Sequence, residues 1–326
     1  MHLYDQETTD EDKFFAETSY AEYHEIKPKK KVDTPFERLK YSLCVNRQIK
    51  TILRRQKINA AIVYEPQGCY CIPFLKKNNI KVIYSERNTG EGVIQSRFLK
   101  KLVKQADVIV SNSFSAKETL KRGLKRPVTQ INNGIITTDM EHINTVSCSD
   151  RTVILVPARI APIKNQMLIL EMLHGMEECS NFKVIFAGKI EDEQYATMLR
   201  DKIGEYSLEN VCEMPGFVED IKRLYSESDV VILPSFEEGM SNVVLECFAN
   251  KKLILCSRIP MNLVNLEVEK FAFNPNDPSD LYDKFMKALE MSEEELKEYI
   301  NTNFDFVCRE HSIDNMVRSY IELVRK

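Results

Sequence analysis

Short apolar runs alternate with helical patterns along most of this 326-residue chain, and no other feature constrains the fold as strongly. Each run is bounded by polar residues and has the length of a buried parallel strand. In the first half the runs are INAAIVY (58–64), IKVIYS (80–85), DVIVSN (107–112) and PVTQI (127–131). In the second half they are TVILVPA (152–158), FKVIFAG (182–188), residues 211–214, DVVILPS (229–235) and KLILCS (252–257). This alternation predicts an α/β fold.

The segments between the runs have helical periodicity. FERLKYSLCVNRQIKTILRRQK (36–57) repeats apolar residues every three or four positions and carries basic residues on the other face. In the second half the helical patterns are NQMLILEMLHGME (165–177), EQYATMLRDKIGEY (193–206), VEDIKRLYSES (218–228) and SNVVLECFAN (241–250). Because the alternation restarts after residue 150, we predict two doubly wound domains facing a cleft.

The predicted domain boundaries follow from composition. Residues 1–35 are polar and acidic with no strand pattern, 36–135 form a first Rossmann-like domain, and 151–308 form a second. Residues 136–150 are the predicted linker, because they lie in a polar stretch that opens with the turn signal Asn133-Gly134. Residues 309–326 are predicted to form a C-terminal helix that could pack back on the first domain. The four strands predicted for the first domain make a thin sheet, so this domain is expected to be incomplete, as a truncated or misassigned reading frame or as a reduced variant.

The charge of −4 conceals an uneven distribution. Residues 36–126 hold 20 basic and 6 acidic residues, whereas 127–326 hold 20 basic and 34 acidic. A basic first half suggests an anionic partner, such as phospholipid headgroups or a lipid diphosphate. A solvated charged face explains the same distribution, and the sequence leaves both readings open. The helical pattern at 96–106 likewise fits packing on its own sheet or lying in a membrane interface.

Other classes of protein and site fit the sequence poorly. No run approaches the roughly 18 to 20 apolar residues of a membrane span, and the N-terminus lacks a signal-peptide pattern. We therefore expect a cytoplasmic protein, with peripheral attachment at the inner membrane face compatible with the basic half. The nine cysteines and five histidines show no metal-ligand spacing, so we expect reduced thiols and no metal. We expect no nucleic-acid partner.

The candidate site residues follow the predicted strands of the second half. Facing α/β sheets bind ligands outside the carboxyl ends of their strands. Arg159 and Lys164 follow the strand at 152–158, Gly188 ends the next, and LPSFEEGMSN follows the strand that begins at 229. Cations, glycines and a helix start together predict a site for an anion such as a diphosphate.

Two acids eight residues apart, Glu238 and Glu246, belong to the same region. Spacing alone says little in a chain with 49 acids, so the context carries the prediction. Gly239 permits close backbone approach, and Ser241 is the predicted N-cap of the helix that bears Glu246.

These motifs carry a family resemblance. ARIAPIKNQ, IFAG, GFVEDIKRLYSESDVVILPS and EGMSNVVLE, together with ADVIVSNSFSAKETL and INNGI in the first half, resemble the retaining nucleotide-sugar glycosyltransferases of family 4. The resemblance implies the GT-B fold of two Rossmann-like domains. It also implies that Arg159 and Lys164 grip the donor diphosphate, that Glu238 contacts the donor sugar, and that Glu246 binds ribose hydroxyls.

The remaining implied contacts lie around the nucleotide. Gly188 and Val218 match positions that border the nucleoside, and Gly239, Met240, Ser241 and Asn242 form the helix start beside the diphosphate. Fixed cations and a helix N-terminus stabilise a departing diphosphate without a metal. The resemblance further implies same-face attack with retention, so neither acid need be a nucleophile.

The expected function is transfer of a sugar from a nucleotide sugar, UDP-linked, to a lipid-linked or polysaccharide acceptor in surface-glycan synthesis. The alternative is a catalytically weak nucleotide-sugar-binding subunit that needs a partner for its acceptor half. Two departures from the family pattern stand out. Glu86, Arg87 and Asn88 follow the strand where many relatives have a histidine, and the loop after 252–257 lacks the usual glycines.

Overall fold

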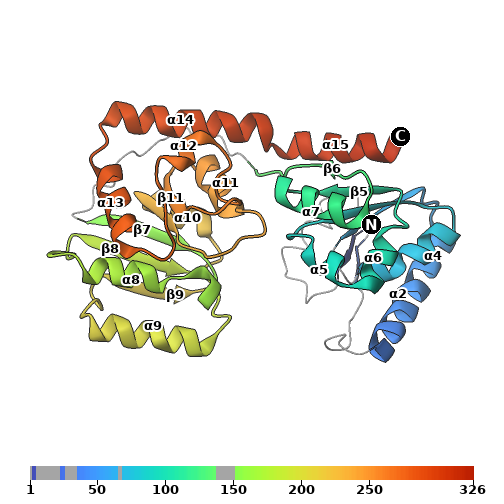
Figure 1. Cartoon of the computed structure of the whole chain (residues 1–326), viewed down its shortest axis with the longest axis horizontal. Coiled ribbons are helices and arrows are strands. Elements are labelled where there is room, and N and C mark those ends of the chain that lie inside the picture. Colours follow the sequence, from blue (N-terminus) through green and yellow to red (C-terminus); the bar gives the residue numbers. More distant parts are fainter. Residues whose placement is uncertain (1, 5–22, 26–34, 65–67, 137–150) are drawn as a thin grey trace. The chain divides into compact units, whose positions relative to one another are not determined.

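The computed structural model describes residues 2–4, 23–25, 35–64, 68–136 and 151–326. The chain divides into two compact units, which we call unit 1 (Met1–Ile131 and Tyr320–Lys326) and unit 2 (Asn132–Ser319). Each unit is built around a parallel sheet with helices packed against it (Figure 1). The predicted fold class, α/β with two Rossmann-like sheets, is confirmed.

Unit 2 contains a six-stranded parallel sheet in the order β12-β11-β10-β7-β8-β9. The strands are β7 (Thr152–Pro157), β8 (Phe182–Ala187), β9 (Cys212–Gly216), β10 (Val230–Leu233), β11 (Leu253–Ser257) and β12 (Ala272–Phe273). Central strands of such a sheet are covered on both faces, which is why β7 and β10 are nearly continuous apolar runs with Ile154 and Val231 fully buried. The chain leaves β7 toward β8 and β9, then crosses to β10 on the other side. The strand order therefore reverses between β7 and β10, and this switch point is where open α/β sheets bind ligands.

Several unit 2 helices begin at a side chain that accepts a hydrogen bond from a free backbone N–H group of the first turn. Asp192, Asp220, Asp277 and Ser292 each accept a hydrogen bond from the first turn of the helix that follows. The helices are α8 (Met167–His174), α9 (Glu193–Glu205), α10 (Ile221–Glu227), α11 (Asn242–Ala249), α12 (Leu266–Glu269), α13 (Pro278–Leu289) and α14 (Glu293–Glu310), with a 3₁₀ turn, η2, at Pro162–Lys164.

Unit 1 contains a four-stranded parallel sheet in the order β3-β4-β5-β6. The strands are β3 (Ala60–Tyr64), β4 (Lys81–Glu86), β5 (Val108–Ser111) and β6 (Thr129–Gln130). The helices are α2 (Pro35–Arg55), α4 (Ile72–Lys77), α5 (Glu91–Gln95), α6 (Arg97–Val103) and α7 (Phe114–Leu124), with a 3₁₀ turn, η1, at Cys69–Cys71. In α6, Leu102 and Val103 are buried in the core while Phe98 is 50% exposed, so most of this helix's apolar face packs within unit 1.

Some expectations about the ends of the chain need correction. The first 35 residues were expected to hold no strand, yet β1 (His2–Tyr4) and β2 (Tyr23–Glu25) pair in parallel, apart from the four-stranded sheet. Three-residue strands are too short to leave an apolar run in the sequence. At the C-terminus, α14 ends at Glu310 and α15 (Ile313–Arg325) follows, so the break falls inside the single helix expected at 309–326.

Two further segments bear on the domain organisation. Most of the predicted linker, residues 137–150, lies outside the described residues. The hydroxyl of Tyr320, on α15, lies 2.7 Å from the Ser85 hydroxyl at the end of β4, and both residues belong to unit 1. Within the described residues, no helix is both long enough and apolar enough to cross a membrane.

Candidate functional site

Lys164 and Glu238 form an ion pair at the switch point of the unit 2 sheet. Lys164 follows β7 and Glu238 follows β10, and these strands are neighbours in the sheet. Nζ of Lys164 lies 2.7 Å from Oε1 of Glu238, and the two side chains are only 13% and 11% exposed. The structure thus brings together two residues that the sequence placed in one site.

Backbone contacts fix the loops that carry this pair. The amide N–H of Phe236 donates to the carbonyl of Ile163 at 2.9 Å. Asn165, in the left-handed conformation with φ of 54°, donates through its side-chain amide to the carbonyls of Pro234 (3.2 Å) and Pro275 (2.8 Å). Asparagine tolerates this backbone conformation better than most residues. Lys164 and Glu238 are therefore held by neighbouring groups on both sides rather than by their own attraction alone.

Arg159 has a protein partner that the sequence did not indicate. It forms an ion pair with Glu191, and the two side chains are 58% and 48% exposed. Their loops are joined by hydrogen bonds from Ile160 N to the Lys189 carbonyl (2.9 Å) and from Glu191 N to the Ile160 carbonyl (3.1 Å). The sequence did not indicate Glu191 as a partner of Arg159, because nothing in the sequence shows that these two loops meet.

Gly188 lies where backbones crowd together at the ends of β7 and β8. A Cβ atom at this position would lie 2.1 Å from the Ala158 carbonyl oxygen and 2.9 Å from the Arg159 nitrogen, distances that real side chains do not reach. The Gly188 N–H also donates to the Gly216 carbonyl at 2.8 Å. Val218, in the loop after β9, is half-buried and packs on the unit 2 core, beside Phe217, which is 75% exposed.

The start of α11 differs from the capped starts of α9, α10, α13 and α14. Ser241 occupies the N-cap position, as predicted, but its side chain does not cap the helix. Its buried hydroxyl donates instead to Oδ1 of Asn262, whose amide donates to the Ser257 carbonyl at 2.9 Å. The Ser241 side chain thus caps no N–H group of α11; Asn242 N donates instead to the Met240 carbonyl (2.8 Å) and Val244 N to the Ser241 carbonyl (3.1 Å). The helix start still carries the positive end of the helix dipole, which attracts anions.

The other predicted residues of this helix start follow directly. Gly239 and Met240 are half-buried, and the exposed Asn242 accepts a hydrogen bond from the Asn133 amide at 2.8 Å. The sequence did not indicate Asn262 as a partner of Ser241, because it lies in the glycine-poor loop from which no donor contact was predicted.

Glu246 lies one turn into α11 and has a buried phenol as its neighbour. The hydroxyl of Tyr225, on α10, donates to Oε2 of Glu246 at 3.3 Å. Burial raises the pKa of the Glu246 carboxyl above its ordinary value, and the Tyr225 hydrogen bond opposes that rise. Burial, and next the charge of Glu246, raise the pKa of Tyr225 well above its usual range, so the phenol remains a donor.

Glu86, in unit 1, has hydrogen-bond partners that lie close to it in the sequence. Glu86 is 3% exposed and accepts hydrogen bonds from the Tyr84 hydroxyl (2.6 Å) and the Asn88 backbone N–H (3.0 Å). The Arg87 guanidinium lies 5.4 Å from the ring centre of Tyr64. These contacts brace the turn that follows β4.

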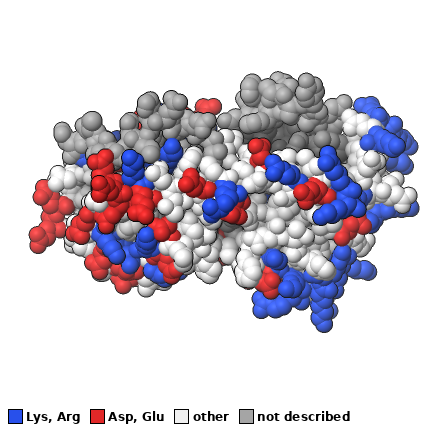
Figure 2. Space-filling view, turned by 90° about the horizontal axis from the view of Figure 1, so that it is seen from above, with Lys and Arg blue, Asp and Glu red and all other residues white. Residues whose placement is uncertain are grey.

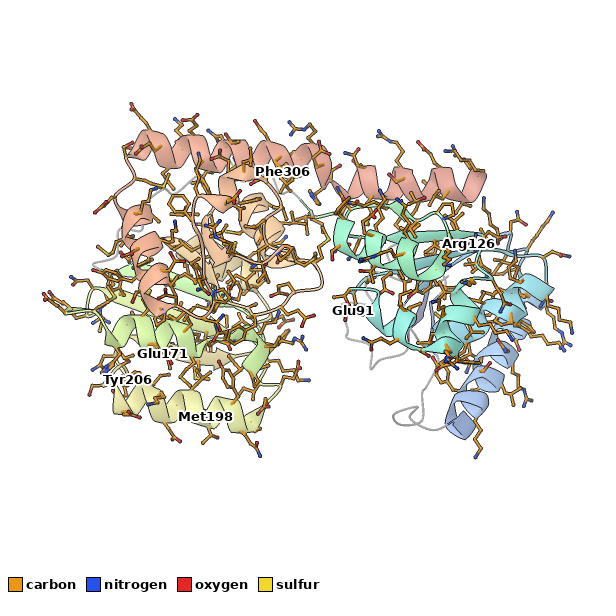
Figure 3. The ribbon with its side chains drawn as sticks, viewed as in Figure 1. Glu91, Arg126, Glu171, Met198, Tyr206 and Phe306 are labelled. Atoms are coloured by element: carbon orange, nitrogen blue, oxygen red, sulfur yellow. The ribbon has the colours of Figure 1, made fainter. Side chains whose placement is uncertain are left out.

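Lys and Arg side chains dominate the coloured surface of unit 1 in the space-filling view (Figure 2). Some of these cations have structural partners. Arg126, labelled in Figure 3, donates to the carbonyls of Lys104 (2.7 Å), Ala106 (2.6 Å) and Asp107 (3.1 Å). Others are exposed, including Lys101 and Lys104 of the α6 region, so part of the positive charge faces solvent.

Comparison with known proteins adds the family and the fold relatives. The family described as "Glycosyl transferases group 1" matches residues 140–304. An uncharacterized glycosyltransferase of Methanocaldococcus jannaschii is 25% identical over 181 residues, which is 54% of this chain. That alignment spans 45% of the relative, so the chain matches less than half of its length.

Solved structures share the fold at low sequence identity. A glycosyltransferase from Rickettsia africae superposes with a TM-score of 0.75 at 18% identity, covering 92% of this chain and 84% of that one. Anabaena HepE, in complex with UDP-glucose, gives 0.74 at 15% identity, covering 96% and 88%. Sucrose-phosphate synthase from Thermosynechococcus elongatus gives 0.72 at 14% identity, covering 92% and 82%. The family match extends over 165 of the 326 residues, and the chain belongs to the glycosyl transferases group 1 family.

Proposed function

We propose that this protein transfers a sugar, with retention of configuration, from a UDP-linked donor bound at the carboxyl edge of the unit 2 sheet. The observation that carries the proposal is the Lys164–Glu238 pair at the switch point, 2.7 Å apart and shielded from solvent on most sides. Family membership supports the transferase activity. The UDP-glucose complex of HepE, a protein with the same fold, supports the choice of donor.

Each residue of the site has a chemical role in this proposal. Departure of the nucleotide concentrates negative charge on its diphosphate, and Lys164, Arg159 and the N–H groups at the start of α11 stabilise that charge. Such groups are fixed before the reaction, so they need little reorganisation as the charge develops. The bond between the anomeric carbon and the diphosphate breaks as the acceptor hydroxyl oxygen attacks from the same face, and the hydroxyl proton passes to the departing diphosphate.

Glu238 acts on the sugar rather than on the nucleotide. Its carboxylate accepts hydrogen bonds from sugar hydroxyls and thereby orients the anomeric carbon toward the acceptor. Lys164 lies beside it, so the side chain that holds the diphosphate also fixes the side chain that holds the sugar. Gly188 and Val218 border the nucleoside, and the Glu246 carboxylate accepts hydrogen bonds from the ribose hydroxyls.

The acceptor in this proposal is lipid-linked or a growing surface polysaccharide, and unit 1 attaches to the anionic inner face of a membrane. The net charge of +14 over residues 36–126 supports this attachment, because anionic lipids attract clustered exposed cations. The second candidate function is a catalytically weak subunit that binds nucleotide sugar and relies on a partner for the acceptor half. The four-stranded sheet of unit 1, smaller than the six-stranded sheet of unit 2 among the described residues, favours it.

Two measurements on the purified chain separate these candidates. Calorimetric titration with UDP tests the donor site, and we expect Arg159→Ala to weaken UDP binding about 10- to 100-fold, with Lys189→Ala as the exposed control. Release of UDP from a panel of UDP-sugars, with and without membrane extract as acceptor source, tests turnover. UDP binding without turnover under any of these conditions would favour the binding subunit, and no UDP binding at all would refute both.

A further inference from the structure

Tyr225 and Glu246 form a pair that the sequence did not reveal. Tyr225 is 1% exposed, and its hydroxyl donates to Oε2 of Glu246. Glu246 itself is only half-buried. Among the described residues its Oε1 has no hydrogen-bond partner, and it is not one of the fully buried unsatisfied atoms. One carboxylate oxygen is therefore held from inside the fold while the other remains accessible.

The backbone around Tyr225 is fixed as firmly as its hydroxyl. The Ser228 hydroxyl donates to the Tyr225 carbonyl at 2.9 Å. Lys252, which is 9% exposed and lies just after α11, donates to the carbonyls of Ser226 (3.1 Å) and Ser228 (2.8 Å) at the end of α10. These bonds tie the end of α10 to the turn after α11. The helix end is held by these bonds and the ring itself is buried, so the packing around Tyr225 restricts rotation of its ring away from Glu246.

Holding a carboxylate in one orientation matters for what it can bind. An ionised carboxylate has about four acceptor positions, and the Tyr225 hydroxyl occupies one of them. A flexible glutamate loses rotamer entropy when it binds a ligand. A glutamate that is already held loses less, so its hydrogen bonds to ligand hydroxyls contribute more to affinity.

We infer that Tyr225 is a positioning residue for nucleotide recognition: its buried hydroxyl orients the Glu246 carboxylate so that the remaining acceptor positions bind the vicinal hydroxyls of a ribose. This inference rests on the proposed function, in which Glu246 faces the ribose of UDP. It adds a chemical consequence, since a carboxylate oriented in this way selects ribose over deoxyribose. Tyr225 does not touch the nucleotide and acts only through Glu246.

The phenol also affects the ionisation of its partner. Its hydrogen bond lowers the pKa of Glu246, against the larger effect of burial, which raises that pKa. Among the described residues, two influences shift the pKa of Glu246: its own burial and the hydrogen bond from Tyr225. The adjacent titratable side chain is the Cys247 thiol, and burial raises its pKa as well. Removal of the phenol therefore raises the pKa of Glu246. The loss of ribose recognition on acidification, which we call its acid limb, then begins at higher pH.

The test measures the dissociation constants of UDP and of 2′-deoxy-UDP between pH 4.5 and 8, and follows their ratio. Because both ligands carry the same diphosphate, its ionisation affects both dissociation constants equally and cancels in their ratio. We expect the wild-type protein to prefer UDP by about tenfold or more. Tyr225→Phe should lower that preference about threefold to tenfold and shift its acid limb upward in pH.

Two further variants test whether the effect of Tyr225→Phe acts through Glu246. Tyr225→Phe should have no additional effect on the ratio in a Glu246→Ala background, because no side-chain acceptor then remains for the phenol to orient. Tyr299→Phe is the matched control: it also removes one buried phenol hydrogen bond, to the Ile254 carbonyl, without contacting Glu246. It should leave both the ratio and its pH dependence unchanged.

The outcomes separate this inference from the function on which it rests. An unchanged UDP preference and acid limb in folded Tyr225→Phe, beside a preference that Glu246→Ala abolishes, would overturn the role of Tyr225 alone. Absence of UDP binding by the wild-type protein would instead remove the proposed function. Should Tyr225→Phe not fold, Tyr225→Met offers the same loss of donor with a side chain that adapts to irregular space.

Discussion

Nζ of Lys164 lies 2.7 Å from Oε1 of Glu238, although 74 residues separate them in the sequence. The pair exists because β7 and β10 are neighbours and their following loops are joined by the Phe236–Ile163 and Asn165–Pro234 hydrogen bonds. A cation and a carboxylate at one sheet edge can bind opposite parts of a nucleotide sugar, the diphosphate and the hydroxyls of the sugar.

Glu238→Gln should reduce turnover of the UDP-sugar by about 100-fold or more, with less than about a fivefold loss of UDP affinity. The amide cannot accept sugar hydrogen bonds as a carboxylate does, whereas the nucleotide contacts are unchanged. Steady-state kinetics and calorimetry together give both numbers. Glu237→Gln, a substitution at the exposed neighbouring residue, is the control and should change neither. A Glu238→Gln enzyme with full activity would remove this residue from the site.

Lys164→Met should destabilise the protein by about 1 to 3 kcal/mol, because it leaves the mostly buried Glu238 carboxylate without its cation. Adding Glu238→Gln should recover part of that loss, since the unpaired charge is then gone. Urea denaturation of both single variants and the double variant measures the coupling. Strictly additive effects would mean that the ion pair contributes nothing to stability.

Gly188→Ala should prevent correct packing at the ends of β7 and β8 and cost about 3 kcal/mol or more, because its Cβ would overlap the Ala158 backbone. Gly92→Ala is the matched control: no atom lies within 4 Å of its added Cβ, and Gly92 is in helix α5. There the change should stabilise by about 0.5 to 1 kcal/mol. Thermal unfolding distinguishes the two, and equal melting temperatures would contradict the close approach at Gly188.

His311 should make the stability of unit 2 depend on pH. Burial lowers the pKa of its imidazole, opposed by its hydrogen bond with the Asn133 carbonyl at 3.1 Å. The native state therefore binds fewer protons than the unfolded state, whose histidine titrates near about 6.5. The free energy of unfolding is thus fully present above that pH and falls as pH drops below it. Urea midpoints between pH 5 and 8 should show this slope.

The variant His311→Gln should flatten the dependence, while His174→Gln, at an exposed histidine stacked on Tyr206, should preserve it. A slope that persists unchanged in His311→Gln would assign the titration to another group.

Anionic vesicles should bind the protein more tightly than neutral ones, and the binding should weaken as salt rises from about 0.05 to 0.5 M because exposed charges are screened. Reversing the two exposed cations Lys101 and Lys104 to Glu should weaken it at least about tenfold. Reversing Lys287 and Lys297, two exposed cations of unit 2, makes the same charge change and should have little effect. Cosedimentation measures all three, and salt-independent binding would point to the exposed ring of Phe98 rather than to charge.

Sequence patterns predicted the sheets well because each central strand is buried on both faces and must be apolar throughout. They indicated Lys164 and Glu238 as candidate site residues because both follow such strands. They could not predict that these two residues pair, since the neighbours of β7 depend on the strand order of the whole sheet. For the same reason they could not predict that Arg159 pairs with Glu191.

The remaining differences come from side chains whose partners lie far along the chain. Ser241 has the sequence signature of a helix cap, yet its hydroxyl bonds to Asn262, 21 residues away. Tyr225 reads as an ordinary apolar position of an amphipathic helix, and only the packing of α10 beside α11 turns its hydroxyl toward Glu246. Periodicity identifies buried positions, but not which buried polar atom meets which.

The Asn165 amide joins the loop after β7 to the carbonyls of Pro234 and Pro275, so three turns at one edge of the sheet share a single residue. A one-residue insertion in any of these turns would misalign its own contact and disturb the other two. Length variation among relatives should therefore be rare here and gather in the turns at the amino ends of the strands.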